Sequence, residues 1–183
     1  MDWNSLNPPY FHILVGNRAE FGQYAYWLNY KAHHDHNCQY VVRTLRGSKM
    51  KNVDHLYDEF SAALQFPEYF GENWAAFDEC IADLDWLPAR GYILMVYEAA
   101  FLLNDEVSDR PAFLRIMAKT CKEWATAPHA YFPVKLEPTP FHVLFHAREA
   151  EVSPILEFLN PVSPHTPVVL LKDIPEAMLA ANR

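Results

Sequence analysis

The stretch FPEYFGENWAAFDECIADLDW, residues 66–86, decides how this chain folds. Pro67 ends one helix and Gly71 breaks the backbone, which predicts a tight turn and then a second helix opened by Glu72 and Asn73. In a helix, apolar residues at positions i, i+3, i+4 and i+7 form one stripe that faces a core. Four residues of the second helix have this spacing: Phe77, Cys80, Ile81 and Leu84.

The opposite face of this predicted helix is acidic. We expect five carboxylates to point within roughly 80° of one direction, with small alanines at Ala75 and Ala82 leaving the surface between them flat: Glu72, Asp78, Glu79, Asp83 and Asp85. A solvated helix face usually mixes charges of both signs, but no Lys or Arg occurs from Phe66 to Ala89. Two aromatic residues and a glycine precede this face. This composition favours a recognition surface over the alternative, an ordinary solvated face.

The run PEYFGENWAAFDECI, residues 67–81, resembles the PEYYGEN signature of the barstar-like family of ribonuclease inhibitors. The resemblance covers Val41 to about Trp124. It implies a small α/β fold whose glycine turn and following helix plug the active-site cleft of a cationic nuclease. The helix would stand there in place of the phosphates of the substrate.

The resemblance also implies which residues bind the partner, and the acidic face adds Asp83. These residues are Tyr69, Phe70, Gly71, Asn73, Trp74, Ala75, Asp78, Glu79, Asp83 and Glu123. Glu79 keeps an acid where the family has an aspartate, and Glu123 keeps another family acid. Ala75 lacks an acid of the family, Asp78 replaces a tryptophan, and Lys119 replaces a glutamate. These departures favour a partner other than barnase, though still a basic one.

Length and charge narrow the class of protein. The 183 residues, 51% of them hydrophobic, are enough for a globular domain with a packed core. The net charge of −8 is uneven: residues 66–109 hold ten acids and only Arg90, whereas the rest of the chain holds 13 acids and 14 bases. This distribution disfavours nucleic acid as a ligand and favours a basic protein partner.

Cysteine usage and hydropathy favour the cytoplasm. Three cysteines form no paired framework, no apolar run has the length of a membrane span, and the first residues lack the pattern of a secretion signal. We expect Cys80 and Cys121 to be core residues, with no cofactor and no metal. One alternative stays open, because His34, His36 and Cys38 would share one side of an extended backbone and could bind a metal.

Beyond the central stretch, the pattern predicts alternating strands and helices. The predicted strands are residues 10–15, 39–45, 92–97, 141–146 and 168–171. The predicted helices are residues 18–32, residues 53–65 capped by Asn52, a helix that starts at Pro111, and residues 148–159. Four prolines make residues 128–140 an extended connection.

The two ends of the chain share a pattern. Phe-His-x-Leu-x3-Arg occurs at residues 11–18 and again at 141–148, either by chance or because two related βα units extend the central sheet. We therefore expect an α/β fold with a small barstar-like parallel sheet, packed with helices and extended by flanking βα units. The predicted division is an N-terminal βα extension over 1–38, a barstar-like core over 39–127 and a C-terminal extension over 128–183 that packs on the core.

Three classes of function follow. The favoured one is a non-catalytic inhibitor: a cytoplasmic immunity protein or antitoxin that occludes the active site of a basic, nuclease-type toxin with the acidic helix. The alternative is a regulatory or scaffold protein that uses the same fold for a non-nuclease partner. An enzyme is not expected, because the nine histidines show no catalytic spacing. The sequence leaves open the identity of the toxin and the oligomeric state.

Overall fold

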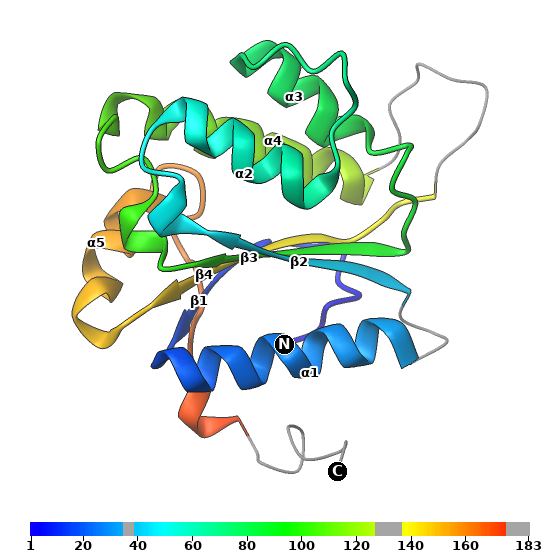
Figure 1. The fold of residues 1–183 in the computed structure, drawn as a ribbon. Helices are drawn as coiled ribbons and strands as arrows, with labels where there is room; N and C mark the ends of the chain where they lie inside the picture. Colours follow the sequence, from blue (N-terminus) through cyan, green and yellow to red (C-terminus); the bar gives the residue numbers. More distant parts are fainter. Residues whose placement is uncertain (35–38, 127–136, 175–183) are drawn as a thin grey trace.

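A computed structural model describes residues 1–34, 39–126 and 137–174, and it shows one parallel sheet covered by helices on both faces (Figure 1). The strands are β1 (Phe11–Val15), β2 (Tyr40–Arg46), β3 (Gly91–Tyr97), β4 (Phe141–Ala147) and β5 (Val168–Leu170). They pair in parallel in the order β2-β3-β4-β1-β5. The predicted α/β class with a parallel sheet is confirmed.

The helices are α1 (Arg18–His34), α2 (Val53–Leu64), α3 (Trp74–Asp83), α4 (Arg110–Thr126) and α5 (Val152–Leu159). Figure 1 shows α1 on one side of the sheet and α2, α3 and α4 on the other. Residues of α5 join the core on the side of α2 and α4. Each strand therefore contributes to two cores, as β1 does with Ile13 on one face and Leu14 on the other.

Burial on both faces explains why the strands read as continuous apolar runs. In β3, six of the seven residues are buried, and in β4 all seven are. The free cysteines Cys80 and Cys121 are buried as well, so both are core residues as expected. Among the described residues, no helix is long and apolar enough to cross a membrane.

Asparagine caps begin the two helices beside the signature. The side chain of Asn52 accepts a hydrogen bond from His55 N at 2.9 Å, and that of Asn73 accepts one from Ala76 N at 3.0 Å. The expected break at Gly71 differs from the structure. The left-handed residue of the turn is Glu72, with φ of 47°, and none of the glycines has a positive φ.

The order of the strands gives the last part of the chain a central place. β4 lies in the middle of the sheet, between β3 and β1, although the sequence pattern assigns residues 141–147 to a C-terminal extension. The flanking strands β1 and β5 do extend the sheet on one side. One sheet runs through all three proposed parts. The division at residues 38 and 127 remains a prediction.

The histidine-rich segment is only partly visible. His34 stacks on Tyr30 with ring centroids 4.0 Å apart, and its Nδ1 lies 3.0 Å from the Tyr30 carbonyl oxygen. His36 and Cys38 lie outside the described residues. Within residues 1–34, 39–126 and 137–174, no three His, Cys, Asp or Glu side chains gather in a way that could hold a metal ion. The absence of a metal remains a prediction.

Candidate partner-binding surface

The turn before α3 presents one aromatic ring to solvent and packs another against the core. Tyr69 is 71% exposed. Phe70 is half-buried, with its ring centroid 5.0 Å from that of Phe66 and 5.7 Å from that of Tyr57. A hydrogen bond of 2.9 Å from Phe70 N to the Pro67 carbonyl closes the turn. The side chain of Tyr69 is therefore exposed to solvent, while its backbone is fixed by the closed turn.

Trp74 joins the turn to α2 and to the residue that precedes α4. Its ring is half-buried against Tyr57, 5.4 Å between centroids, and its Nε1 donates to Asp109 Oδ1 at 3.2 Å. Asn73 adds a second bond, from its Nδ2 to the Gly71 carbonyl at 3.0 Å. The role of Asp109 could not be seen in the sequence, because this residue lies 35 positions away and outside the signature.

The two faces of α3 differ as the periodicity predicts. Phe77, Cys80 and Ile81 are buried, and so is Leu84 directly after the helix. The outward side carries Ala75, Glu79 and Asp83, all of which are exposed. This helix therefore contributes an apolar side to the core and a carboxylate-bearing side to the surface.

The acidic helix face is smaller than expected. α3 begins at Trp74 and ends at Asp83, so Glu72 and Asp85 do not belong to it. Leu84 adopts a left-handed conformation with φ of 47°, which redirects the chain before Asp85. The helix itself carries three of the five expected acids. Glu72 and Asp85 are exposed in the flanking turns.

One of the three helix acids is neutralised within the protein. Lys119 on α4 places its Nζ 2.7 Å from Asp78 Oδ2 and 3.9 Å from Glu123 Oε2. The bond to Asp78 raises the pKa of Lys119, so the lysine stays protonated beside the two acids. Asp78 and Glu123 thus share Lys119 as a partner and are only partly exposed to solvent. Glu79, in contrast, is exposed on the outward side of α3.

The ring of Tyr69 lies in a negative field. Desolvation first, and then negative neighbours that include Asp83, Asp85 and Glu79, raise the pKa of its phenol. Tyr69, Glu79, Asp83 and Asp85 are all exposed, and we call these four residues the acidic surface. Such a surface can accept charge-assisted hydrogen bonds from Lys or Arg of a partner.

One comparison with known proteins bears on this surface. The model of the Barstar family, described as barnase inhibitor, matches residues 40–146. The match begins at the first residue of β2, contains α2, α3 and α4, and reaches almost to the end of β4. It thus extends beyond Trp124, where the resemblance seen in the sequence stops, and takes in the central strand. Among curated proteins, none matches the chain.

Proposed function

The chain belongs to the Barstar family of barnase inhibitors, and from this premise we propose that it is a non-catalytic inhibitor of a basic, nuclease-type toxin. The inhibitor would occlude the active site of the toxin with α3 and the turn before it. The partner-binding residues expected from the sequence remain part of this proposal: Tyr69, Phe70, Gly71, Asn73, Trp74, Ala75, Asp78, Glu79, Asp83 and Glu123.

The acidic surface supplies the chemistry. A nuclease binds the phosphates of its substrate through Lys, Arg and His, and carboxylates can take the place of those phosphates. Glu79 is suited to this role because it is exposed, lies within the signature and projects from a helix whose other side is buried. Tyr69 would add an aromatic contact beside it.

The surface is also held in place before binding. Hydrogen bonds at Phe70, Asn73 and Trp74 fix the turn, and the Asn73 cap fixes the start of α3. A surface that is already ordered loses less conformational entropy when it binds. We infer that the turn and α3 dock with little rearrangement of their backbone.

Charge would guide the encounter. The excess of acids within residues 66–109 gives this side of the chain a negative field, which attracts a cationic partner over distance and repels nucleic acid. A protein of this kind would act as an immunity protein or antitoxin in the cytoplasm of the cell that makes the toxin, and we propose that setting here.

The observation that carries the proposal is the exposed Glu79 within the family signature on an otherwise core-facing helix. The test is to measure association with barnase and with other basic ribonuclease domains, including any toxin domain encoded beside this chain, from about 20 mM to about 1 M salt. We expect binding that blocks RNA cleavage and an association rate that falls steeply with salt. A rate that does not change with salt, or no binding to any basic nuclease, would contradict the proposal.

A further inference from the structure

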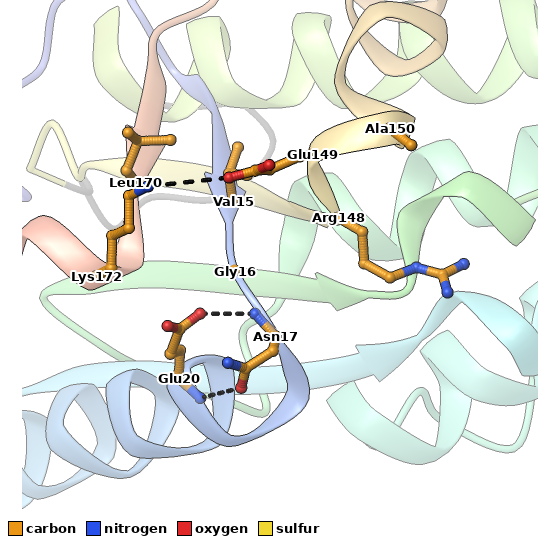
Figure 2. A pocket seen from close by; sticks show the side chains of 9 residues that line it. All are labelled: Val15, Gly16, Asn17, Glu20, Arg148, Glu149, Ala150, Leu170 and Lys172. Atoms are coloured by element: carbon orange, nitrogen blue, oxygen red, sulfur yellow. Dashed lines mark hydrogen bonds and ion pairs between the residues drawn. The ribbon is translucent and has the colours of Figure 1, made fainter.

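A cavity of about 460 Å³, whose lining includes none of the residues of the acidic surface, lies at one edge of the sheet (Figure 2). It opens where β1 ends at Val15, β4 ends at Ala147 and β5 ends at Leu170. The residues that follow these strands form its walls, among them Asn17, Arg148 and Lys172. Its size falls within the range of about 300 to 1,000 Å³ that is typical of small-molecule sites.

The topology of the sheet explains why a crevice forms at the ends of β1 and β4. After β1 the chain turns to α1 on one face of the sheet, and after β4 it turns to α5 on the other face. β1 and β4 are neighbours, so the two connections diverge at their carboxyl ends. In open parallel sheets, ligands bind in the crevice at such a point.

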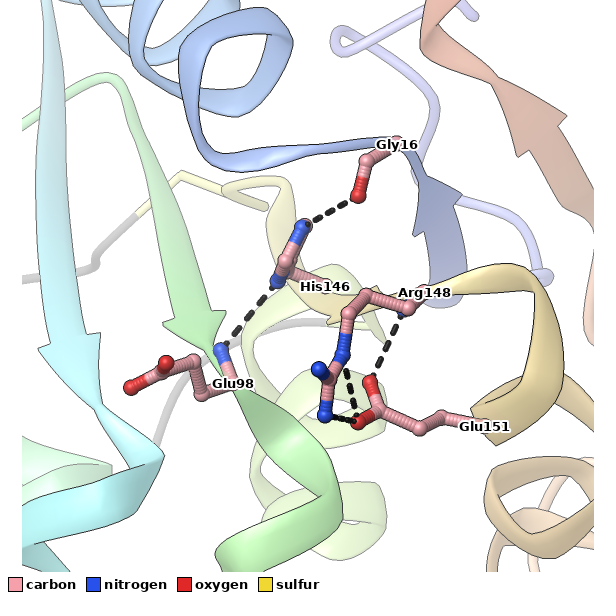
Figure 3. Close-up of polar contacts among 5 residues, drawn as sticks. All are labelled: Gly16, Glu98, His146, Arg148 and Glu151. Atoms are coloured by element: carbon pink, nitrogen blue, oxygen red, sulfur yellow. Dashed lines mark hydrogen bonds and ion pairs between the residues drawn. The ribbon is translucent and has the colours of Figure 1, made fainter.

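Hydrogen bonds fix Gly16 and Arg148, two of the residues that line the cavity (Figure 3). His146 lies at the end of β4, where its Nδ1 accepts from Glu98 N at 3.3 Å. Its Nε2 therefore carries the proton and donates to the Gly16 carbonyl at 2.9 Å, which ties β4 to β1. Glu151, outside the cavity, accepts a hydrogen bond from Arg148 N at 2.9 Å and pairs with the Arg148 guanidinium. The frame is thus formed without a ligand.

The charges around the cavity are balanced. Two acids, Glu20 and Glu149, stand with two bases, Arg148 and Lys172. Arg148 is engaged by Glu151, and Glu20 accepts from Asn17 N at 2.7 Å. A purely anionic ligand would meet both acids, and a purely cationic ligand would meet both bases. A ligand that carries one charge of each sign avoids both penalties.

Glu149 and Lys172 are the pair that such a ligand can separate. The Lys172 Nζ and Glu149 Oε1 atoms are 3.9 Å apart across the end of β1 in Figure 2, and their side chains are 59% and 82% exposed. An exposed pair at this distance is weak, so a ligand that pairs with both groups replaces little. Beside them, Val15 and Leu170 offer an apolar wall.

We propose that this cavity binds a free α-amino acid with an apolar side chain, as its zwitterion. The ammonium group pairs with Glu149, the carboxylate group pairs with Lys172, and the side chain packs on Val15 and Leu170. The site is separate from the acidic surface, so it can be present whether or not the chain inhibits a nuclease.

The test uses three ligands and four proteins. Leucine, N-acetyl-leucine and leucine methyl ester are titrated into the full chain and followed by NMR chemical shifts, because each derivative lacks one charge of leucine. We expect leucine to bind and each derivative to bind at least about tenfold more weakly. Glu149→Gln should weaken leucine and remove the discrimination against N-acetyl-leucine. Lys172→Gln should weaken leucine and remove the discrimination against the methyl ester.

Glu157→Gln, an exposed acid on α5 outside the cavity, is the matched control and should bind all three ligands like the parent. Thermal unfolding checks that each variant is folded. The proposal is overturned if leucine causes no shifts up to about 10 mM, if the three ligands bind equally to the parent, or if Glu149→Gln and Lys172→Gln bind leucine as the parent does.

Discussion

The ammonium group of Lys119 on α4 lies 2.7 Å from the carboxylate of Asp78 on α3, a residue 41 positions earlier in the chain. The helix that carries the family signature is thereby tied by charge to a helix outside it. The pair removes one acid from the field that a partner meets, and Glu79 and Asp83 carry the exposed negative charge of α3. Lys119 therefore offsets the negative charge of Asp78 on the same helix as Glu79 and Asp83.

Replacing Lys119 should strengthen the attraction of a basic partner. Lys119→Gln releases Asp78, so we expect the association rate with a basic nuclease domain to rise. The free energy of unfolding should change by no more than about 1 kcal/mol, because the pair is half-exposed. Lys122→Gln, exposed on the same helix, makes the same change in net charge without touching Asp78. Equal association rates for the two variants, measured by surface plasmon resonance, would show that the Asp78 contact does not matter.

Glu79→Ala should separate binding from folding. If Glu79 pairs with Lys or Arg of the toxin, its removal leaves that charge buried and unpaired, which typically costs about 2 to 5 kcal/mol of binding. Stability should stay within about 0.5 kcal/mol of the parent, because the side chain is exposed. Glu157→Ala on α5 is the control. The measurement is how strongly each variant inhibits RNA cleavage by the toxin. Equal inhibition by both variants would rule out occlusion of the active site by α3.

Phe77→Ala should damage the fold. Phe77 is fully buried, and its ring lies against those of Phe60 and Trp74, at 5.0 and 5.8 Å between centroids. Truncation leaves a cavity and should lower the free energy of unfolding by about 3 to 5 kcal/mol. Tyr69→Ala removes an aromatic ring from the exposed turn instead, and it should leave stability within about 0.5 kcal/mol while weakening binding. Urea unfolding of both variants checks this contrast.

Acid should destabilise the protein through His12. Burial first, and then the nearby His142, lower the pKa of His12 to about 4, and its ring is enclosed by Trp3 at 5.3 Å between centroids. The unfolded chain therefore binds this proton near pH 6.5 and the folded chain only near pH 4. Above about pH 6.5, protonation of His12 does not affect stability. As the pH falls from about 6.5 to about 4, only the unfolded chain takes up this proton, so the free energy of unfolding falls by about 3 kcal/mol.

Denaturant unfolding between these two pH values measures the effect. Carboxylates also titrate in this range, so His12→Leu serves as the comparison. The variant should show a flatter pH dependence than the parent. Identical pH dependence of the two proteins would mean that His12 does not titrate as its buried position implies.

The sequence by itself determined the local features of this protein. The stripe of Phe77, Cys80 and Ile81, the cap at Asn73 and the apolar run of β3 all depend on neighbours within a few residues, and periodicity captures such contacts. The signature at residues 67–81 is just as local, so the family could be recognised from it. The acidic surface was predicted in outline for the same reason.

Only the tertiary structure decided what depends on distant residues. The left-handed Leu84 ends α3 and moves Asp85 off the helix, which helical spacing alone could not show. Lys119 neutralises Asp78 because α4 packs on α3. β4 takes the middle of the sheet, beside β1, and so creates the cavity at their ends. Pairing of strands and packing of helices bring together residues far apart in the chain, and no local pattern records which partner each will meet.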